Sequence, residues 1–136
     1  MVKFSWAKAK HLRLGITGEN KACALLRSKN ADIICRNYKV KAGEIDIVAR
    51  DGGMLVFAEV KTRRHTSRSR PAEGLSLKQK KRIYRAAMNY LNAIDRPHCV
   101  FRFDLIEIVA SPFRLHEVRH WQNHFSAKNI FPNYDK

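Results

Sequence analysis

The chain has 136 residues, of which 45% are hydrophobic, and this size predicts a single domain with one core. Its 27 lysines and arginines outnumber its 12 acidic residues and give a formal net charge of +15, which indicates a polyanionic partner, nucleic acid above all. We expect a cytoplasmic protein without a membrane partner, because there is neither an apolar run of roughly 18 residues nor a secretory signal, and the three dispersed cysteines support neither a disulfide framework nor a zinc ribbon.

The first predicted elements are a helix, a strand and a hairpin. Residues 14–29 carry apolar side chains at helical spacing, and residues 31–40 have the composition of a strand. Residues 42–50 and 55–63 both alternate between apolar and polar side chains, and Asp51-Gly52-Gly53 separates them. This pattern is a hairpin signature.

The second half of the chain begins with a basic loop at residues 65–74. Ser76 is a predicted N-cap for a long helix that ends near Asp95, before Pro97. The apolar face of this helix is expected to comprise Leu77, Ile83 or Tyr84, Ala87, Met88, Leu91 and Ile94. Residues 100–110 form a predicted strand, and residues 114–125 add either a last strand or a short helix.

These elements predict an α/β fold, with a mixed sheet flanked by helices in the order helix-strand-strand-strand-helix-strand. The single domain is expected to span residues 14–125. A basic N-terminal arm at residues 1–13 precedes it, and a C-terminal tail at residues 126–136 follows it.

The predicted hairpin gathers charged side chains on one face of the sheet. Side chains alternate along a strand, so one face of the first strand carries Glu44, Asp46 and Val48, and the other carries Ile45, Ile47 and Ala49. A two- or four-residue turn pairs even positions of this strand with odd positions of the next. Glu44, Asp46, Glu59 and Lys61 then lie together, with directly opposed pairs about 5 Å apart. A three-residue turn would break this arrangement.

Clustered carboxylates repel one another unless a cation lies between them. Mg²⁺ or Mn²⁺ prefers carboxylate oxygens, and we expect it to bind between Asp46 and Glu59 with the carbonyl of Val60 as a further ligand. Lys61 would orient an attacking water or stabilise the charged transition state of phosphodiester cleavage. The alternative is a solvated hairpin face with cross-strand salt bridges.

A basic run directly follows the predicted carboxylate cluster. Between Lys61 and Arg85 there are ten lysines and arginines and one acid, Glu73. Such a run favours a phosphate backbone as the partner. The candidate nucleic-acid-binding residues are Arg63, Arg64, Arg68, Arg70, Lys78, Lys80, Lys81 and Arg82.

The hairpin motifs also resemble those of a known family. The strings G-E-I-D-I-V-A (Gly43–Ala49) and V-F-A-E-V-K-T-R (Val56–Arg63) resemble the PD-(D/E)XK nuclease superfamily. More narrowly, the chain is similar to the YraN family of endonuclease-like proteins, which resemble archaeal Holliday junction resolvases. Further matching strings are L-G-x-x-G-E from Leu14, R-N-Y from Arg36, A-A-x-x-Y-L from Ala86 and R-F-D from Arg102.

The resemblance implies a restriction-endonuclease-like core in which Asp46 and Glu59 bind the metal and Lys61 is catalytic. It also implies that Glu19, on the first helix, joins the site and its metal. The function to expect is a Mg²⁺- or Mn²⁺-dependent endonuclease acting on branched or structured DNA, with a homodimer by analogy. The alternatives are a non-catalytic nucleic-acid-binding module that retains the fold, and an enzyme directed at RNA.

Three histidines recur at every fourth position, at His116, His120 and His124. They would align on a continuous helix, which a metal site there would require. The neighbouring Val118, Trp121 and Phe125 do not clearly favour a helix.

Overall fold

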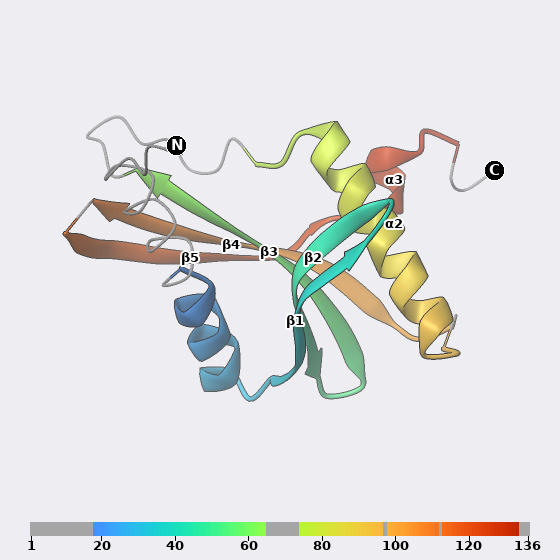
Figure 1. Ribbon diagram of the computed structural model, residues 1–136, viewed down its shortest axis with the longest axis horizontal. Helices are drawn as coiled ribbons and strands as arrows, with labels where there is room; N and C mark the ends of the chain where they lie inside the picture. Colours follow the sequence, from blue (N-terminus) through green and yellow to red (C-terminus); the bar gives the residue numbers. More distant parts are fainter. Residues whose placement is uncertain (1–17, 65–73, 97, 112, 134–136) are drawn as a thin grey trace, which may run out of the picture.

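The computed structural model describes residues 18–64, 74–96, 98–111 and 113–133 (Figure 1). The predictions for residues 1–17, 65–73 and 134–136, which include Arg68 and Arg70, lie outside this part of the chain. The described elements are a helix at residues 18–28 followed by β1 (Asp32–Val40), β2 (Gly43–Asp51), β3 (Met54–Arg64), α2 (Leu77–Ala93), β4 (Phe101–Ser111), β5 (Arg114–Phe125) and α3 (Ala127–Ile130).

The strands form one mixed sheet in the order β1-β2-β3-β4-β5. Neighbouring strands are antiparallel except β3 and β4, which are parallel because α2 carries the chain back between them. The predicted α/β class with flanking helices is therefore confirmed. The predicted element order is wrong in that it stops after one strand beyond α2, whereas the structure adds β5 and α3.

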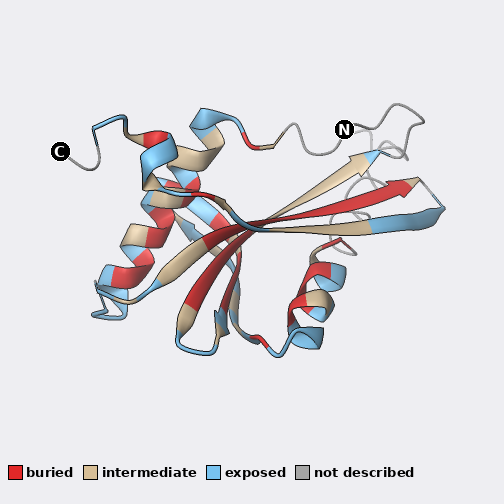
Figure 2. Ribbon diagram, turned by 180° about the vertical axis from the view of Figure 1, so that it is seen from behind, coloured by how far each residue is buried: buried red, intermediate tan, exposed pale blue. Residues whose placement is uncertain are grey.

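Two layers of helix cover the sheet. The helix at residues 18–28 packs Ala22, Cys23 and Leu26 onto one face, against β2, β3 and β4. The first half of the sheet is covered on its other face by α2, which contributes Ile83 and Leu91 to a second cluster. Figures 1 and 2 show the two helices on opposite sides of the sheet, with the buried residues of β4 running between them.

The cap and the centre of α2 agree with the sequence, but the ends of its apolar face do not. The Ser76 side chain accepts a hydrogen bond from the backbone of Gln79, and the Gln79 side chain accepts one from the backbone of Ser76. This capping box fixes the start of the helix. Leu77 is 51% exposed and Ile94 is 39% exposed, because the core does not extend beneath the two ends of the helix.

The β2–β3 hairpin has the predicted parity. Asp51 pairs with Met54 across a two-residue turn, and Gly52 in that turn has a φ of 60°. Such a left-handed conformation favours glycine. Even positions of β2 consequently lie opposite odd positions of β3, as expected.

The strict alternation along β2 fails at Asp46. Ile45 and Val48 belong to the same core cluster beneath α2, so Ile45 does not lie on the predicted opposite face. The alternation of side chains between the two faces of the sheet is interrupted here, because the pairing of β2 with β3 ends at Ile47 and Ala58. On the other side of β2, Asn37 of β1 lies opposite Asp46, between the pairs Arg36–Ile47 and Tyr38–Ile45. Asn37 has a φ of 54°.

Residues 114–125 form a strand, which resolves the alternative between strand and helix. The positions of His116, His120 and His124 therefore do not follow a helix, and His120 is instead bonded to the buried Asp104 at 2.8 Å. Asp104 also accepts bonds from Arg102 Nε and the backbone of Asn123. The R-F-D string thus supplies a fully bonded buried carboxylate that ties β4 to β5.

The described segment after β5 also contributes to the core. Ile130 on α3 is 4% exposed, and the ring of Phe131 packs against Tyr84 of α2. Cys23, Cys35 and Cys99 are free thiols. None of the helices described is long and apolar enough to cross a membrane.

Candidate active site

Asp46 lies where β2 separates from β3. Its Oδ2 accepts a hydrogen bond of 2.8 Å from the backbone N–H of Val60. Since Ile47 pairs with Ala58, continuation of the same register sets Asp46 opposite Glu59. Because the two strands diverge here, the Asp46 carboxylate can accept the hydrogen bond of the Val60 N–H in place of a backbone carbonyl of β2.

Glu59 extends from β3 toward Asp46, and the two carboxyl groups interact directly. Burial raises the pKa of both. For Glu59 the charge of Asp46 and a hydrogen bond between the two side chains add to burial and raise its pKa from 4.5 to about 8. Two like charges so close together in a poorly solvated place favour a bound proton or cation between them.

Lys61 lies on the same face of β3 as Glu59, two residues further along. Its Nζ is 3.4 Å from Oε1 of Glu59, with 27% of the lysine side chain and 13% of the glutamate side chain exposed. The lysine charge lowers the pKa of Glu59, opposing part of the rise that burial causes. The structure therefore brings Asp46, Glu59 and Lys61 together.

Glu44 does not join this group. Its carboxylate is 3.9 Å from Lys39 Nζ, and the Glu44 side chain is half exposed. Glu44 therefore lies at the exposed margin of the group and not inside it. Its charge is nevertheless near enough to raise the pKa of Asp46.

Glu19 is near the pair but engaged elsewhere. It lies on the helix at residues 18–28, and Arg36 NH2 of β1 is 3.3 Å from its Oε2. Its charge raises the pKa of Asp46. Glu19 is thus a neighbour of the carboxylate pair, held by an arginine.

The arrangement has the donor set that a hard divalent cation prefers. Among the residues that the structure describes, no group of three or more His, Cys, Asp or Glu side chains is placed to hold a metal ion. Mg²⁺ commonly binds proteins through one or two carboxylates while it retains waters, and the Asp46–Glu59 pair is compatible with that mode of binding. The carbonyl of a strand residue points to the same side as its N–H, so the Val60 carbonyl faces the Asp46 side as well.

Arg63 has a different environment from the other predicted phosphate contacts. Its Nε is 3.2 Å from Oε2 of Glu107 on β4, and its NH2 donates to the carbonyl of Gly74 at 3.3 Å. Glu107 is only 1% exposed and also accepts a bond of 2.7 Å from Trp121 Nε1. The role of this buried acid was missed, because its partners are far away in the sequence. Arg64, next to Arg63, is exposed.

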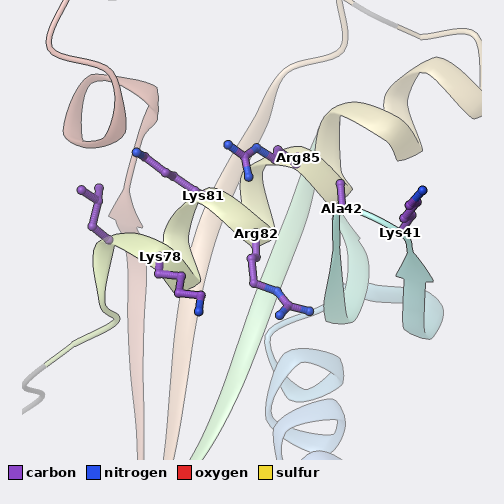
Figure 3. Close-up of a pocket in the computed structure, with 7 residues that line it drawn as sticks. Lys41, Ala42, Lys78, Lys81, Arg82 and Arg85 are labelled. Carbon is purple, nitrogen blue, oxygen red and sulfur yellow. The ribbon is translucent and has the colours of Figure 1, made fainter.

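The predicted cations of α2 lie on its exposed first half. Lys80 lies over the ring of Phe125, 5.9 Å from its centroid. The other three line a pocket of about 500 Å³ between α2 and the β1–β2 turn (Figure 3). The lining residues are Lys41, Ala42, Leu77, Lys78, Lys81, Arg82 and Arg85. The sequence did not indicate Lys41 and Arg85 as members of this cluster, since only the tertiary fold brings the β1–β2 turn next to α2.

The sequence model of the uncharacterised protein family UPF0102 matches residues 18–108. The chain belongs to this family. The UPF0102 protein of Chlorobaculum parvum is 39% identical over 118 residues, covering 86% of this chain and 92% of that relative. A second UPF0102 protein, from Symbiobacterium thermophilum, is 39% identical over 117 residues, covering 85% and 98%. A third, from Nocardia farcinica, is 37% identical over 99 residues, covering 73% and 78%.

Membership of UPF0102 supports the narrower resemblance, to YraN-type proteins. The matched residues include β2, β3 and α2, and therefore the carboxylate pair, Lys61 and the basic pocket.

Proposed function

We propose that this UPF0102 protein is a Mg²⁺- or Mn²⁺-dependent endonuclease that hydrolyses phosphodiester bonds of branched or structured DNA. The observation that carries the proposal is the convergence of Asp46, Glu59 and Lys61. Two carboxyl groups share a poorly solvated place at the divergence of two strands, and an ammonium group lies 3.4 Å from one of them.

The surrounding topology supports a restriction-endonuclease-like core. An antiparallel β1–β2–β3 meander carries the site residues, and α2 crosses over to β4, which is parallel to β3. This arrangement agrees with the core that the PD-(D/E)XK resemblance implies.

Asp46 and Glu59 would hold the cation, with the Val60 carbonyl as a further ligand. Bound Mg²⁺ or Mn²⁺ offsets negative charge on the scissile phosphate and makes nearby water more acidic. The Val60 N–H fixes the orientation of Asp46. Lys61 orients the attacking water or stabilises negative charge in the transition state. Glu19 remains an accessory acid in this proposal, because it must leave Arg36 before its carboxylate reaches the cation.

The test is a cleavage assay on branched, flapped, single-stranded and duplex DNA, and on matched RNA, with Mn²⁺, Mg²⁺ or EDTA. Wild type is expected to cut branched DNA only with a divalent cation. Asp46→Asn and Glu59→Gln should each lower the rate by about 100-fold or more while leaving DNA affinity intact, since neither carboxylate contacts phosphate directly.

Glu44→Gln is the matched control, because it removes a neighbouring carboxylate on the same strand that pairs with Lys39. It should cut at the wild-type rate. Equal cutting by wild type and both site variants would sink the proposal, as the activity would then arise elsewhere.

One observation favours a second function, that of a non-catalytic nucleic-acid-binding module. The pocket cations are separate from the carboxylate pair and need no chemistry to bind a polyanion. Metal-independent binding to DNA, with no cleavage of any substrate in the panel, would favour this module over the nuclease.

A further inference from the structure

The cations of the pocket gather at one recess with no acidic partner, whereas several other cations of the described chain are paired. Arg50, Arg102 and Arg119 are each within 3.2 Å of a carboxylate oxygen. Within the described ranges, no ion pair involves any of the five pocket cations, which are Lys41, Lys78, Lys81, Arg82 and Arg85.

Five cations around one recess repel one another. None of the described residues that line the pocket is acidic, so none of them compensates this repulsion. A phosphate would offset the charge and accept hydrogen bonds from ammonium and guanidinium groups. Figure 3 shows Lys81, Arg82 and Arg85 projecting from α2, with Lys41 and Ala42 on the neighbouring turn.

The size and the wall of the recess restrict the ligand further. About 500 Å³ is within the range of small-ligand pockets, roughly 300–1,000 Å³, and suits a nucleotide unit better than a duplex. Leu77 is 51% exposed and lines the same recess, so an apolar surface adjoins the cations. An unpaired nucleotide presents both a phosphate and an accessible base face, whereas a duplex hides its base faces by stacking.

The pocket is held rigidly near the carboxylate pair. A Cβ atom at Gly43 would collide with the backbone carbonyl of Arg82, so α2 and β2 are in direct backbone contact. Gly43 precedes Asp46 by three residues, or about 10 Å of extended strand. A nucleic-acid strand anchored in the pocket would therefore reach the pair within a few nucleotides.

We propose that this pocket binds an unpaired nucleotide of the substrate strand, with its phosphate among Lys41, Arg82 and Arg85 and its base or sugar against Leu77. The inference rests on the proposed function for its substrate class. Binding in this pocket would make the protein select nucleic acid that has a single-stranded segment beside the cleaved bond.

The test measures binding of a fluorescent 5′-phosphorylated oligothymidylate by anisotropy, in EDTA and over a range of salt concentrations. The pocket variant is Lys41→Ala/Arg85→Ala, and neither residue belongs to the proposed metal site. We expect about tenfold weaker binding, and a salt slope reduced by about 0.7 for each phosphate that the variant no longer neutralises.

The matched control is Lys21→Ala/Arg27→Ala, which removes the same charge from the helix at residues 18–28, on the other side of the sheet. It should bind much more like wild type. An equal loss of affinity in the control would overturn the pocket assignment, since net charge alone would then explain binding. Equal competition by a duplex of the same length, or by polyglutamate, would overturn the unpaired-nucleotide assignment.

Cleavage at subsaturating protein separates this inference from the proposed function. The pocket variant should cut more slowly than wild type in proportion to its weaker binding, whereas Asp46→Asn should bind the oligonucleotide with unchanged Kd. Pocket-dependent binding without cleavage by wild type would overturn only the proposed nuclease activity. Cleavage with unchanged affinity of the pocket variant would overturn only the pocket.

Discussion

The Asp46 carboxylate accepts a 2.8 Å hydrogen bond from the backbone N–H of Val60, a residue beyond the last paired position of the β2–β3 ladder. A side chain here replaces the backbone partner that a continuing hairpin would provide. Asp46 therefore has two roles, because it satisfies an amide of β3 and carries negative charge next to Glu59. The two roles can be separated by a substitution that keeps the acceptor and removes the charge.

Asp46→Asn should stabilise the metal-free protein while abolishing the binding of Mn²⁺. The asparagine carbonyl can still accept the Val60 N–H, and repulsion with Glu59 disappears. Relief of about 1 kcal/mol corresponds to a rise in Tm of roughly 3–5 °C for a chain of this size. Thermal unfolding in EDTA at pH 8 and Mn²⁺ calorimetry measure the two effects. A fall in Tm of several degrees would show that the charge itself stabilises the fold.

Glu59 should make the metal-free protein less stable as the pH rises. Its pKa is about 8 in the folded protein against 4.5 ordinarily, so between these values the folded state retains a proton that the unfolded chain has lost. The free energy of unfolding should therefore fall from about pH 5 to about pH 8, by at most about 1.4 kcal/mol per pH unit.

The matched variants for this pH dependence are Glu59→Gln and Glu44→Gln. Glu59→Gln should flatten the curve of Tm against pH, whereas Glu44→Gln should preserve it. Stabilisation by Mn²⁺ should grow over the same pH range, because the cation must displace the shared proton. If Tm falls with pH as steeply in Glu59→Gln as in wild type, a group other than Glu59 is responsible for the pH dependence of stability.

Arg63 and Arg64 are neighbours with different expected effects. Arg63→Ala leaves the carboxylate of Glu107, only 1% exposed, without its cationic partner and should cost about 3 kcal/mol of stability. Arg64 is exposed, so Arg64→Ala should leave Tm nearly unchanged and weaken DNA binding. Denaturant unfolding and anisotropy compare the two variants. Equal stability of both would mean that the Arg63–Glu107 contact contributes nothing to the fold.

Much of the fold could be predicted because its signals are local. Gly52-Gly53 marks the hairpin turn, Ser76 with Gln79 marks the start of α2, and the two-residue spacing of Glu59 and Lys61 puts both on one face. These features depend only on the chain within a few residues. The register of the hairpin then brings Asp46 opposite Glu59.

The features that were missed depend on contacts between distant segments. Nothing local indicates that β2 leaves β3 at Asp46, so the predicted facing of Ile45 was wrong. Glu107 interrupts an apolar run, but its partners Arg63 and Trp121 become apparent only in the sheet. The polar edge strand β5 lacks an apolar pattern strong enough to distinguish it from a helix.

Gly43 should connect the packing of α2 to the activity of the site. A methyl group at this position would meet the backbone of Arg82, which can yield only if α2 moves, so Gly43→Ala should cost about 1–3 kcal/mol. The same movement displaces the pocket relative to Asp46, so both oligonucleotide affinity and cleavage rate should fall. Gly53→Ala is the matched control, because nothing lies within 4 Å of its Cβ position. If Gly43→Ala unfolds and cleaves like Gly53→Ala, α2 is not anchored to β2 through this contact, and the pocket and the carboxylate pair act independently.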